Sequence, residues 1–196
     1  MPETRDDILE EFREAGALLE GHFLLSSGLH SPRYLQCALV LQDPNRAERL
    51  CRRLAERLQS RAVDVVVGPA LGAVVVAYEL ARALGARGIF AERQDGRMTL
   101  RRGFAIEPGE KVLLVEDVMT TGGSLREVLE VVRHAGAEVA GVAALVDRTS
   151  GRDPALGTPL VSAVRLDVPA YPPDECPLCR EGVPLVKPGS RTQPGQ

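Results

Sequence analysis

Lys111-Val-Leu-Leu-Val-Glu-Asp-Val-Met-Thr-Thr-Gly-Gly-Ser-Leu125 is the stretch that decides the fold. Its apolar residues 112–115 are typical of a strand buried on both faces, and two carboxylates, Glu116 and Asp117, follow at its carboxyl end. A turn of small residues (120–124) and a helical pattern come next. Because such a turn and a helix N-terminus direct free backbone N–H groups to one point, the sequence predicts a phosphate-binding site there.

The two acids beside this turn need a partner of their own, since they would repel a phosphate. Ribose hydroxyls suit them, because carboxylates only accept hydrogen bonds and vicinal diols donate them. The plainer alternative is an ordinary strand–loop–helix connection with solvated acids and with glycines that only turn the chain. The agreement of acid pair, hydroxyls, glycines and flanking elements favours the ligand site.

Length and composition restrict the class of protein. At 196 residues, the chain fits a single domain over 1–196 that is long enough to bury a full core. The net charge of −3 and the pI near 5.7 indicate no general attraction to nucleic acid or to anionic lipid. No apolar run approaches the roughly 20 residues that span a bilayer, so we expect no membrane partner.

The N-terminal sequence and two of the cysteines bear on location. The start of the chain, Met1-Pro-Glu-Thr-Arg-Asp-Asp7, is acidic and has no apolar segment of the kind found in secretory signals. We therefore expect a cytoplasmic protein, in which Cys37 and Cys51 are buried, reduced thiols.

The pair in Cys176-Pro-Leu-Cys179 has the spacing of two zinc ligands. A closed structural zinc site needs four ligands, and the chain has no second such pair, while its three histidines, His22, His30 and His134, are scattered. We expect a tight turn here; a zinc site shared between two subunits is the alternative.

The periodicity of apolar residues predicts the order of elements. It predicts a helix over 5–20, short strands at 23–25 and 34–41, and a helix from Asp43 to about residue 60. Strands are expected at 63–67, 88–91, 111–115 and 139–146, with helices at 72–84 and 123–135. Apolar strands that alternate with helices imply a parallel sheet covered on both faces, with ligands at the carboxyl ends of the strands.

Three further segments fall at this edge of the sheet. Residues 68–73 (Gly-Pro-Ala-Leu-Gly-Ala) form a second possible anion site. Residues 92–102 carry four arginines, and are either a mobile basic loop over a leaving group or a solvated β-hairpin tip. Arg148 can grip a carboxylate with its planar guanidinium; alternatively, Asp147 and Arg148 pair with surface partners.

Residues 112–124 resemble the 5-phosphoribosyl 1-diphosphate (PRPP) signature of the type I phosphoribosyltransferases. Segments 21–28, 31–34 and 171–182, together with Asp147-Arg148, resemble the bacterial orotate phosphoribosyltransferase family. This resemblance covers about residues 16–187. It implies an α/β fold with a central parallel sheet flanked by helices (core about 44–168) and a small hood from residues 1–43 and 169–187, with a mobile tail at 188–196.

The resemblance also implies a reaction. A pentosyltransferase of this family would convert orotate and PRPP to orotidine 5′-monophosphate and diphosphate, a step of pyrimidine synthesis. It would use Mg²⁺ held by PRPP and water, with no ligand directly from the protein. It would act as a homodimer whose basic loop is shared across the interface.

Site residues follow from the same resemblance. The implied PRPP contacts are Arg93, Arg97, Glu116, Asp117, Val118, Met119, Thr120, Thr121, Gly122, Gly123 and Ser124. The implied orotate contacts are Ser26, Tyr34, Thr120 and Arg148, and the pyrophosphate loop is Ala70, Leu71 and Gly72. Arg97 and Asp117 would be catalytic. Glu116 and Asp117 would hold the ribose 2′- and 3′-hydroxyls, and Arg148 the orotate carboxylate, while Arg93 and Arg97 would reach the diphosphate of the neighbouring subunit.

Several positions depart from the family pattern. Ser26 and Gly72 stand where a lysine is usual, and Gln94 and Thr99 stand where a lysine and a histidine are common. These departures concern the detailed roles of the loop. A purine-base phosphoribosyltransferase, against which the hood sequence argues weakly, is one alternative function, and a PRPP-binding regulator is another. A regulator should carry a helix-turn-helix extension or a basic face, and the sequence shows neither.

Overall fold

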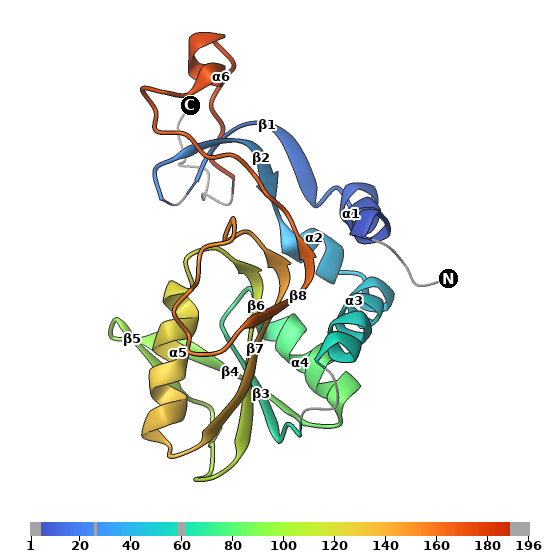
Figure 1. The fold of residues 1–196 in the computed structure, drawn as a ribbon, viewed down its shortest axis with the longest axis vertical. Coiled ribbons are helices and arrows are strands. Elements are labelled where there is room, and N and C mark those ends of the chain that lie inside the picture. The colour runs from blue at the N-terminus through green and yellow to red at the C-terminus, as the bar shows by residue number, and fades with distance from the viewer. Residues whose placement is uncertain (1–4, 26, 59–61, 189–196) are drawn as a thin grey trace.

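The computed structural model describes residues 5–25, 27–58 and 62–188 (Figure 1). Helices and strands alternate along most of the chain. In chain order they are α1 (Arg5–Glu14), β1 (Leu18–Leu24), β2 (His30–Leu35), α2 (Cys37–Leu41), α3 (Pro44–Arg57), β3 (Val65–Pro69), α4 (Val74–Leu84), β4 (Arg87–Gln94), β5 (Arg97–Leu100), β6 (Lys111–Met119), α5 (Gly123–His134), β7 (Glu138–Asp147), β8 (Leu160–Arg165) and α6 (Pro177–Arg180).

A six-stranded sheet in the order β5-β4-β3-β6-β7-β8 forms the centre of the protein. All neighbouring strands are parallel except β5, which returns antiparallel to β4. Helix α5 covers one face of the sheet, and α3 and α4 lie on the other (Figure 1). The predicted α/β fold, a parallel sheet flanked by helices, is confirmed; strand β8 was not predicted.

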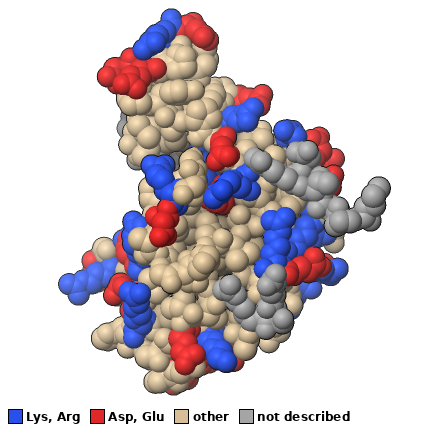
Figure 2. Space-filling view, viewed as in Figure 1, with Lys and Arg blue, Asp and Glu red and all other residues tan. Residues whose placement is uncertain are grey.

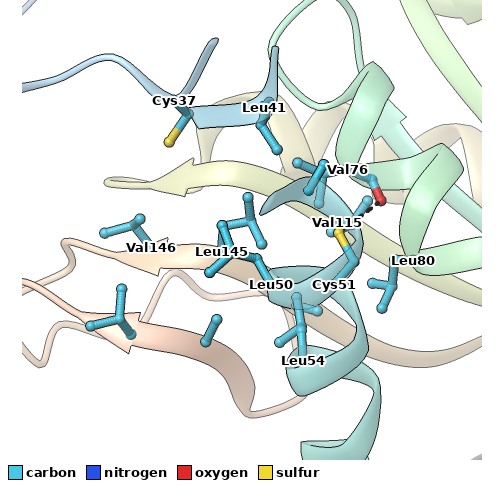
Figure 3. Packing of buried hydrophobic residues seen from close by; sticks show 14 of the residues in the cluster. Cys37, Leu41, Leu50, Cys51, Leu54, Val76, Leu80, Val115, Leu145 and Val146 are labelled. Carbon is cyan, nitrogen blue, oxygen red and sulfur yellow. Dashed lines mark hydrogen bonds between the residues drawn. The ribbon is translucent and has the colours of Figure 1, made fainter. Parts of the chain in front are cut away.

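Each face of the sheet has its own hydrophobic cluster, because successive side chains of a strand point to opposite faces. In β6, Leu113 and Val115 pack against α3 and α4, whereas Val112 and Leu114 pack under α5. Figure 3 shows the first cluster from close by, with the thiol of Cys51 directed at the carbonyl oxygen of Val76, 3.9 Å away. Cys37 and Cys51 are buried as predicted.

Strand β6 is longer than the pattern of apolar residues predicted. It continues through Glu116 and Asp117 to Met119, because its backbone stays paired with β7 as far as Met119 opposite Asp147. The two acids therefore lie within the strand. The expectation that they follow it was wrong.

The predicted helix over residues 5–20 is also wrong at its end. Helix α1 stops at Glu14, and Gly16 takes a left-handed conformation (φ 63°) that turns the chain, while the Ala17 N–H donates to the Phe12 carbonyl. Leu18 and the residue after it fit helical spacing but belong to β1. Hydrophobic spacing alone could not separate the two arrangements.

Residues 34–41 do not form the single strand that was predicted. Strand β2 ends at Leu35, and Cys37–Leu41 is the short helix α2, which turns Cys37, Val40 and Leu41 into the core. The next helix is predicted more accurately. Asp43 caps α3 by accepting hydrogen bonds from the backbone N–H groups of Asn45 and Arg46.

A small lobe lies above the sheet (Figure 1). The β1–β2 hairpin meets the C-terminal segment there, through backbone hydrogen bonds that join His30 to Tyr171 and Leu24 to Val186. Helix α1 is not part of this lobe, because its residues Ile8 and Phe12 pack into the core beneath. The division of the chain at residues 44 and 168 stays a prediction.

The surface carries both signs of charge. On the face seen in Figure 2, basic and acidic side chains are intermixed over the lobe and over the body below it. Among the described helices, none is long and apolar enough to cross a membrane.

Candidate functional site

Two loops meet at the carboxyl edge of the sheet between β3 and β6. The chain runs from β3 to β4 on one side and from β6 to β7 on the other, so this is the point where the strand order reverses, which is where open α/β sheets bind ligands. The loops touch at Gly72, where a Cβ atom would lie 2.8 Å from a carboxylate oxygen of Asp117. A side chain at position 72, such as the lysine common in the family, would therefore displace the Asp117 carboxylate.

A cavity of about 440 Å³ lies over the loop that follows β6. Nearly all of the residues predicted to contact PRPP line it. The lining residues are Arg93, Glu116, Val118, Met119, Thr120, Thr121, Gly122, Gly123, Ser124 and Glu127. Helix α5 begins at Gly123, so the backbone N–H groups of its first turn lie at this cavity.

Arg126 supports the loop from behind, a role that the sequence did not reveal. Its guanidinium donates hydrogen bonds to the carbonyl oxygens of Thr121 (2.7 Å) and Pro154 (2.8 Å). These bonds tie the loop after β6 to the segment that contains Pro154 and hold its backbone in place. The loop can therefore present its donors to a phosphate.

A second cavity of about 840 Å³ lies between the sheet edge and the hood lobe. It contains three of the four residues predicted to bind orotate, Tyr34, Thr120 and Arg148. The fourth, Ser26, lies outside the described residues. The hood contributes Leu24, Leu25 and Leu29 to the apolar part of this cavity, and no motif in the sequence had pointed to them.

The two cavities adjoin and share a wall made by Val118, Thr120 and Thr121. Because β6 continues through the acids, Glu116 lines the smaller cavity and Asp117 the larger one. A ligand with a phosphate at one end can therefore lie in the smaller cavity, pass the two carboxylates and place its other end in the larger cavity.

Glu116 is the most perturbed carboxyl group at the site. Burial raises its pKa to about 8, and the adjacent Asp117 adds to the shift. Burial disfavours the ionised form, and so does a like charge nearby. A ligand that donates hydrogen bonds to this carboxylate would favour ionisation.

We expect Glu116→Gln to stabilise the ligand-free protein in alkaline solution. Below about pH 4.5 the carboxyl is protonated in both the folded and the unfolded state, and above about pH 8 it is ionised in both, which costs the folded state. Between about pH 4.5 and about pH 8, the free energy of unfolding of the wild type should therefore fall relative to that of the variant. Urea unfolding should show a variant advantage that grows by about 1–3 kcal/mol between the two ends of the window.

The control for this experiment is Glu130→Gln. Glu130 lies on the exposed side of α5, where it pairs with Arg133, so its loss should not change the pH dependence. An identical pH dependence of wild type and Glu116→Gln would contradict the buried, perturbed carboxyl.

Asp147 and Arg148 have different surroundings. From the sequence, either Arg148 binds a carboxylate or both residues pair with surface partners. The Asp147 carboxylate accepts hydrogen bonds from the Thr149 N–H (2.8 Å) and the Arg165 Nε–H (2.9 Å). Burial alone would raise the pKa of Asp147, but the hydrogen bonds from Thr149 and Arg165 outweigh it and hold the pKa below its usual value. Asp147 is thus a structural partner.

Arg148 faces the larger cavity. Its Nε–H is buried and has no hydrogen-bond partner among the described residues. Burial lowers the pKa of its guanidinium. An unpaired buried donor in a cavity wall is costly, and a carboxylate ligand would satisfy it.

Residues 92–102 form an antiparallel hairpin of β4 and β5, which is the arrangement of the plainer alternative. Arg93 pairs with Glu127 of its own chain at the smaller cavity, while Arg101 and Arg102 pair with Glu92. Arg97 is exposed and lines neither of the two cavities. Its role therefore stays a prediction.

No thiol at the site is suited to covalent catalysis. Cys37 lines the larger cavity, but burial and the nearby Asp117 raise its pKa well above the usual value. A thiol in this state is a poor nucleophile.

Comparison with known proteins agrees with this geometry. Residues 40–163 match the family described as "Phosphoribosyl transferase domain". A relative from Caldicellulosiruptor bescii, named orotate phosphoribosyltransferase, is 59% identical over 96% of this chain and 98% of its own. The chain belongs to the orotate phosphoribosyltransferase family.

Solved structures of the family have the same fold. The orotate phosphoribosyltransferase of Aeropyrum pernix covers 81% of this chain and 93% of its own, with 29% identity and a TM-score of 0.67. That of Mycobacterium tuberculosis H37Rv, solved with inorganic phosphate, covers 83% of this chain and 95% of its own, with 29% identity and a TM-score of 0.66. The type I phosphoribosyltransferase fold is thereby confirmed.

Proposed function

We propose that this orotate phosphoribosyltransferase binds PRPP across the wall shared by the two cavities and binds orotate against Arg148. The observation that carries the proposal is the buried Nε–H of Arg148, which has no hydrogen-bond partner among the described residues and lies in a cavity that adjoins the loop between β6 and α5. The 5′-phosphate lies in the smaller cavity, and the ribose diol lies at Glu116 and Asp117. The orotate ring then lies under Tyr34 and the apolar hood residues.

The reaction breaks the C1–O bond of PRPP, and diphosphate leaves with the bonding electrons. A ring nitrogen of orotate forms the new bond to C1 and gives up its proton, which passes to the departing diphosphate or to water. Positive charge develops on the ribose as the bond breaks. Asp117 and Glu116 hold the hydroxyls of that ribose, and Arg148 fixes the nitrogen in line with C1.

Mg²⁺ is the proposed cofactor. The residues fit it, because two carboxylates border the cavities and Mg²⁺ is commonly held by one or two carboxylates together with phosphate oxygens and water. When bound, it neutralises charge on the leaving diphosphate. PRPP and water would supply its ligands, and Glu116 and Asp117 would be the nearby acids able to accept hydrogen bonds from such water.

An absorbance assay of orotate consumption with PRPP and Mg²⁺ tests the proposal. We expect turnover with orotate and none with adenine, guanine, xanthine or uracil, because those bases lack the carboxylate that pairs with Arg148. Turnover of a purine base would instead identify a purine phosphoribosyltransferase. PRPP binding without turnover of any base would identify a regulator.

We also propose a homodimer in which the β4–β5 hairpin serves the neighbouring site. Two observations support it. Arg97 lines neither cavity of its own chain. Val75 and Tyr78 are exposed on α4 (40% and 64%), and Leu71 is exposed in the loop just before it (87%), which are apolar side chains of the kind that subunits cover.

Arg97→Ala should lower kcat by roughly 10- to 1000-fold with little change in thermal stability, since the exposed side chain would stabilise the departing diphosphate. We expect activity to return when this variant is mixed with inactive Asp117→Asn protein. One of the two sites in such a heterodimer combines an intact hairpin with an intact ribose site, so verified heterodimers should show about half of wild-type activity.

As a reference, Arg97→Ala is mixed with wild-type protein under the same conditions. The activity of that mixture shows the effect of subunit exchange alone. Heterodimers that stay inactive would mean that the hairpin serves its own subunit. Arg133→Ala, on the exposed end of α5, is the control for loss of a surface arginine.

We place the protein in the cytoplasm. The free, buried thiols of Cys37 and Cys51 support a reducing compartment.

A further inference from the structure

Four side chains that are far apart in the sequence meet inside the hood lobe. They are His22 of β1, His30 of β2, and Cys176 and Cys179 at the start and within α6. One ligand atom from each lies within 4.8 Å of the ligand atoms of the others. Two imidazole nitrogens and two sulfurs are the donor set of structural Cys₂His₂ zinc sites.

The distances between these atoms are those of a compact site. His22 Nε2 lies 3.0 Å from His30 Nδ1 and 3.5 Å from Cys176 Sγ, and Cys179 Sγ lies 3.2 Å from His30 Nδ1 and 3.7 Å from His22 Nε2. In a tetrahedral zinc site, bonds of about 2.0–2.3 Å place the ligand atoms roughly 3.3–3.8 Å apart. Small side-chain adjustments would bring all four to this spacing.

The outer contact of His22 orients it for metal binding. Its Nδ1 lies 2.8 Å from the carbonyl oxygen of Val183, and since a carbonyl only accepts, Nδ1 carries the proton. Nε2 is then the nitrogen with a free lone pair, and it points at the cluster. Histidine ligands of zinc characteristically donate their other N–H to a carbonyl or carboxylate in this way.

Burial also fits a structural metal. His22 is 2% exposed, His30 5% and Cys176 0%, while Cys179 lies at the edge of the lobe. Buried polar groups need partners, and a metal ion would serve as a common partner for all four ligand atoms.

Among the described residues, few hydrophobic contacts stabilise the hood lobe. Its small sheet has two strands, and Phe23 and Cys176 are buried there outside both hydrophobic clusters of the core. A two-stranded hairpin is marginally stable by itself, and small units commonly need a metal or disulfides. The four residues lie where the hairpin meets the C-terminal segment.

We propose that His22, His30, Cys176 and Cys179 bind one structural zinc ion within a single subunit. The ion fastens α6 to the β1–β2 hairpin. Leu24, Leu25 and Leu29 lie between the two histidines in the sequence and line the larger cavity. The ion therefore also fixes the apolar wall over the base. All four ligands come from one chain, in contrast to the site shared between subunits that the sequence allowed.

Metal analysis of untagged, full-length protein tests the proposal. After growth with zinc and gel filtration, we expect about one zinc ion per chain by mass spectrometry. The Cys176→Ser/Cys179→Ser variant and the His22→Ala variant should each lose at least about tenfold of this zinc. Cys51→Ala and His134→Ala, which change a buried cysteine and an exposed histidine elsewhere, should keep it.

Cobalt titration keeps the test decisive if the ligand variants fold poorly. Reduced, metal-free wild-type protein should bind Co²⁺ with the thiolate charge-transfer bands and visible spectrum of a tetrahedral site, and Zn²⁺ should displace it. Hydrogen exchange should speed up in residues 18–35 and 171–187 when zinc is removed, with no change in β3.

Three results would overturn the proposal. One is protein without zinc that also shows no thiolate–cobalt spectrum, as expected of a metal-free hydrogen-bonded cluster. Another is a Cys176–Cys179 disulfide in freshly purified protein. The third is zinc that the ligand variants retain as well as the controls do.

Discussion

Asp117→Asn is expected to lower kcat/KM for PRPP by about 100-fold or more while the unfolding temperature stays within about 2 °C of wild type. The carboxylate faces the larger cavity and makes no ion pair in the described structure, so its loss leaves packing unchanged. Two hydrogen bonds from a ribose diol to a charged acceptor are worth about 1.5–3 kcal/mol each, and the amide replaces one acceptor oxygen by a donor. Steady-state kinetics and calorimetry give the two quantities.

The matched control for Asp117→Asn is Asp147→Asn. Asp147 is a further acid at the carboxyl edge of the sheet, but its carboxylate is engaged by Thr149 and Arg165. That variant should lose stability more than it loses turnover. Near-normal turnover of Asp117→Asn would remove the ribose-diol assignment.

Arg148→Ala has the second large expected effect, a rise in the KM for orotate of about 10- to 100-fold with a much smaller change in the KM for PRPP. The side chain is half-buried on one wall of the cavity, so its charge is poorly screened, and a charge-assisted pair with a carboxylate is worth about 1.5–3 kcal/mol or more. Initial rates at varied concentrations of each substrate separate the two constants.

Two further variants test whether the effect belongs to the planar guanidinium. Arg148→Lys keeps the charge but not the paired donors, and we expect it to recover only part of the orotate affinity. Arg152→Ala removes another cation that lines the same cavity, and its effect should be small and equal for both substrates. Equal losses for orotate and PRPP in Arg148→Ala would reassign the residue to a phosphate or to the fold.

The sheet and the loop between β6 and α5 could be predicted from the sequence because the residues that indicate them are close together in the chain. The apolar run 112–115, the glycines and the helix start all lie within one stretch, and each reports on its own backbone. The continuation of β6 through Glu116 and Asp117 was not accessible. It depends on pairing with β7, and no pattern in residues 116–119 records that pairing.

The hood was the part that the sequence described least well. Leu18 and Leu19 fit the spacing of the helix before them, and only the left-handed Gly16 separates helix from strand. His22 and His30 appeared scattered because they are eight residues apart, and only the hairpin fold brings them together. Contacts between distant segments, here with Cys176 and Cys179, leave no periodic trace in a sequence.

With the substrates placed as proposed, the wall of Val118, Thr120 and Thr121 that the two cavities share makes their binding energetically reciprocal. A molecule in one cavity becomes part of the surface that the other molecule meets, so each changes the affinity of the other by the same factor. The substrate that binds first is then the one whose cavity is better formed while the other cavity is empty. The substrate that binds first displaces the water at this wall. The second substrate therefore does not have to displace it.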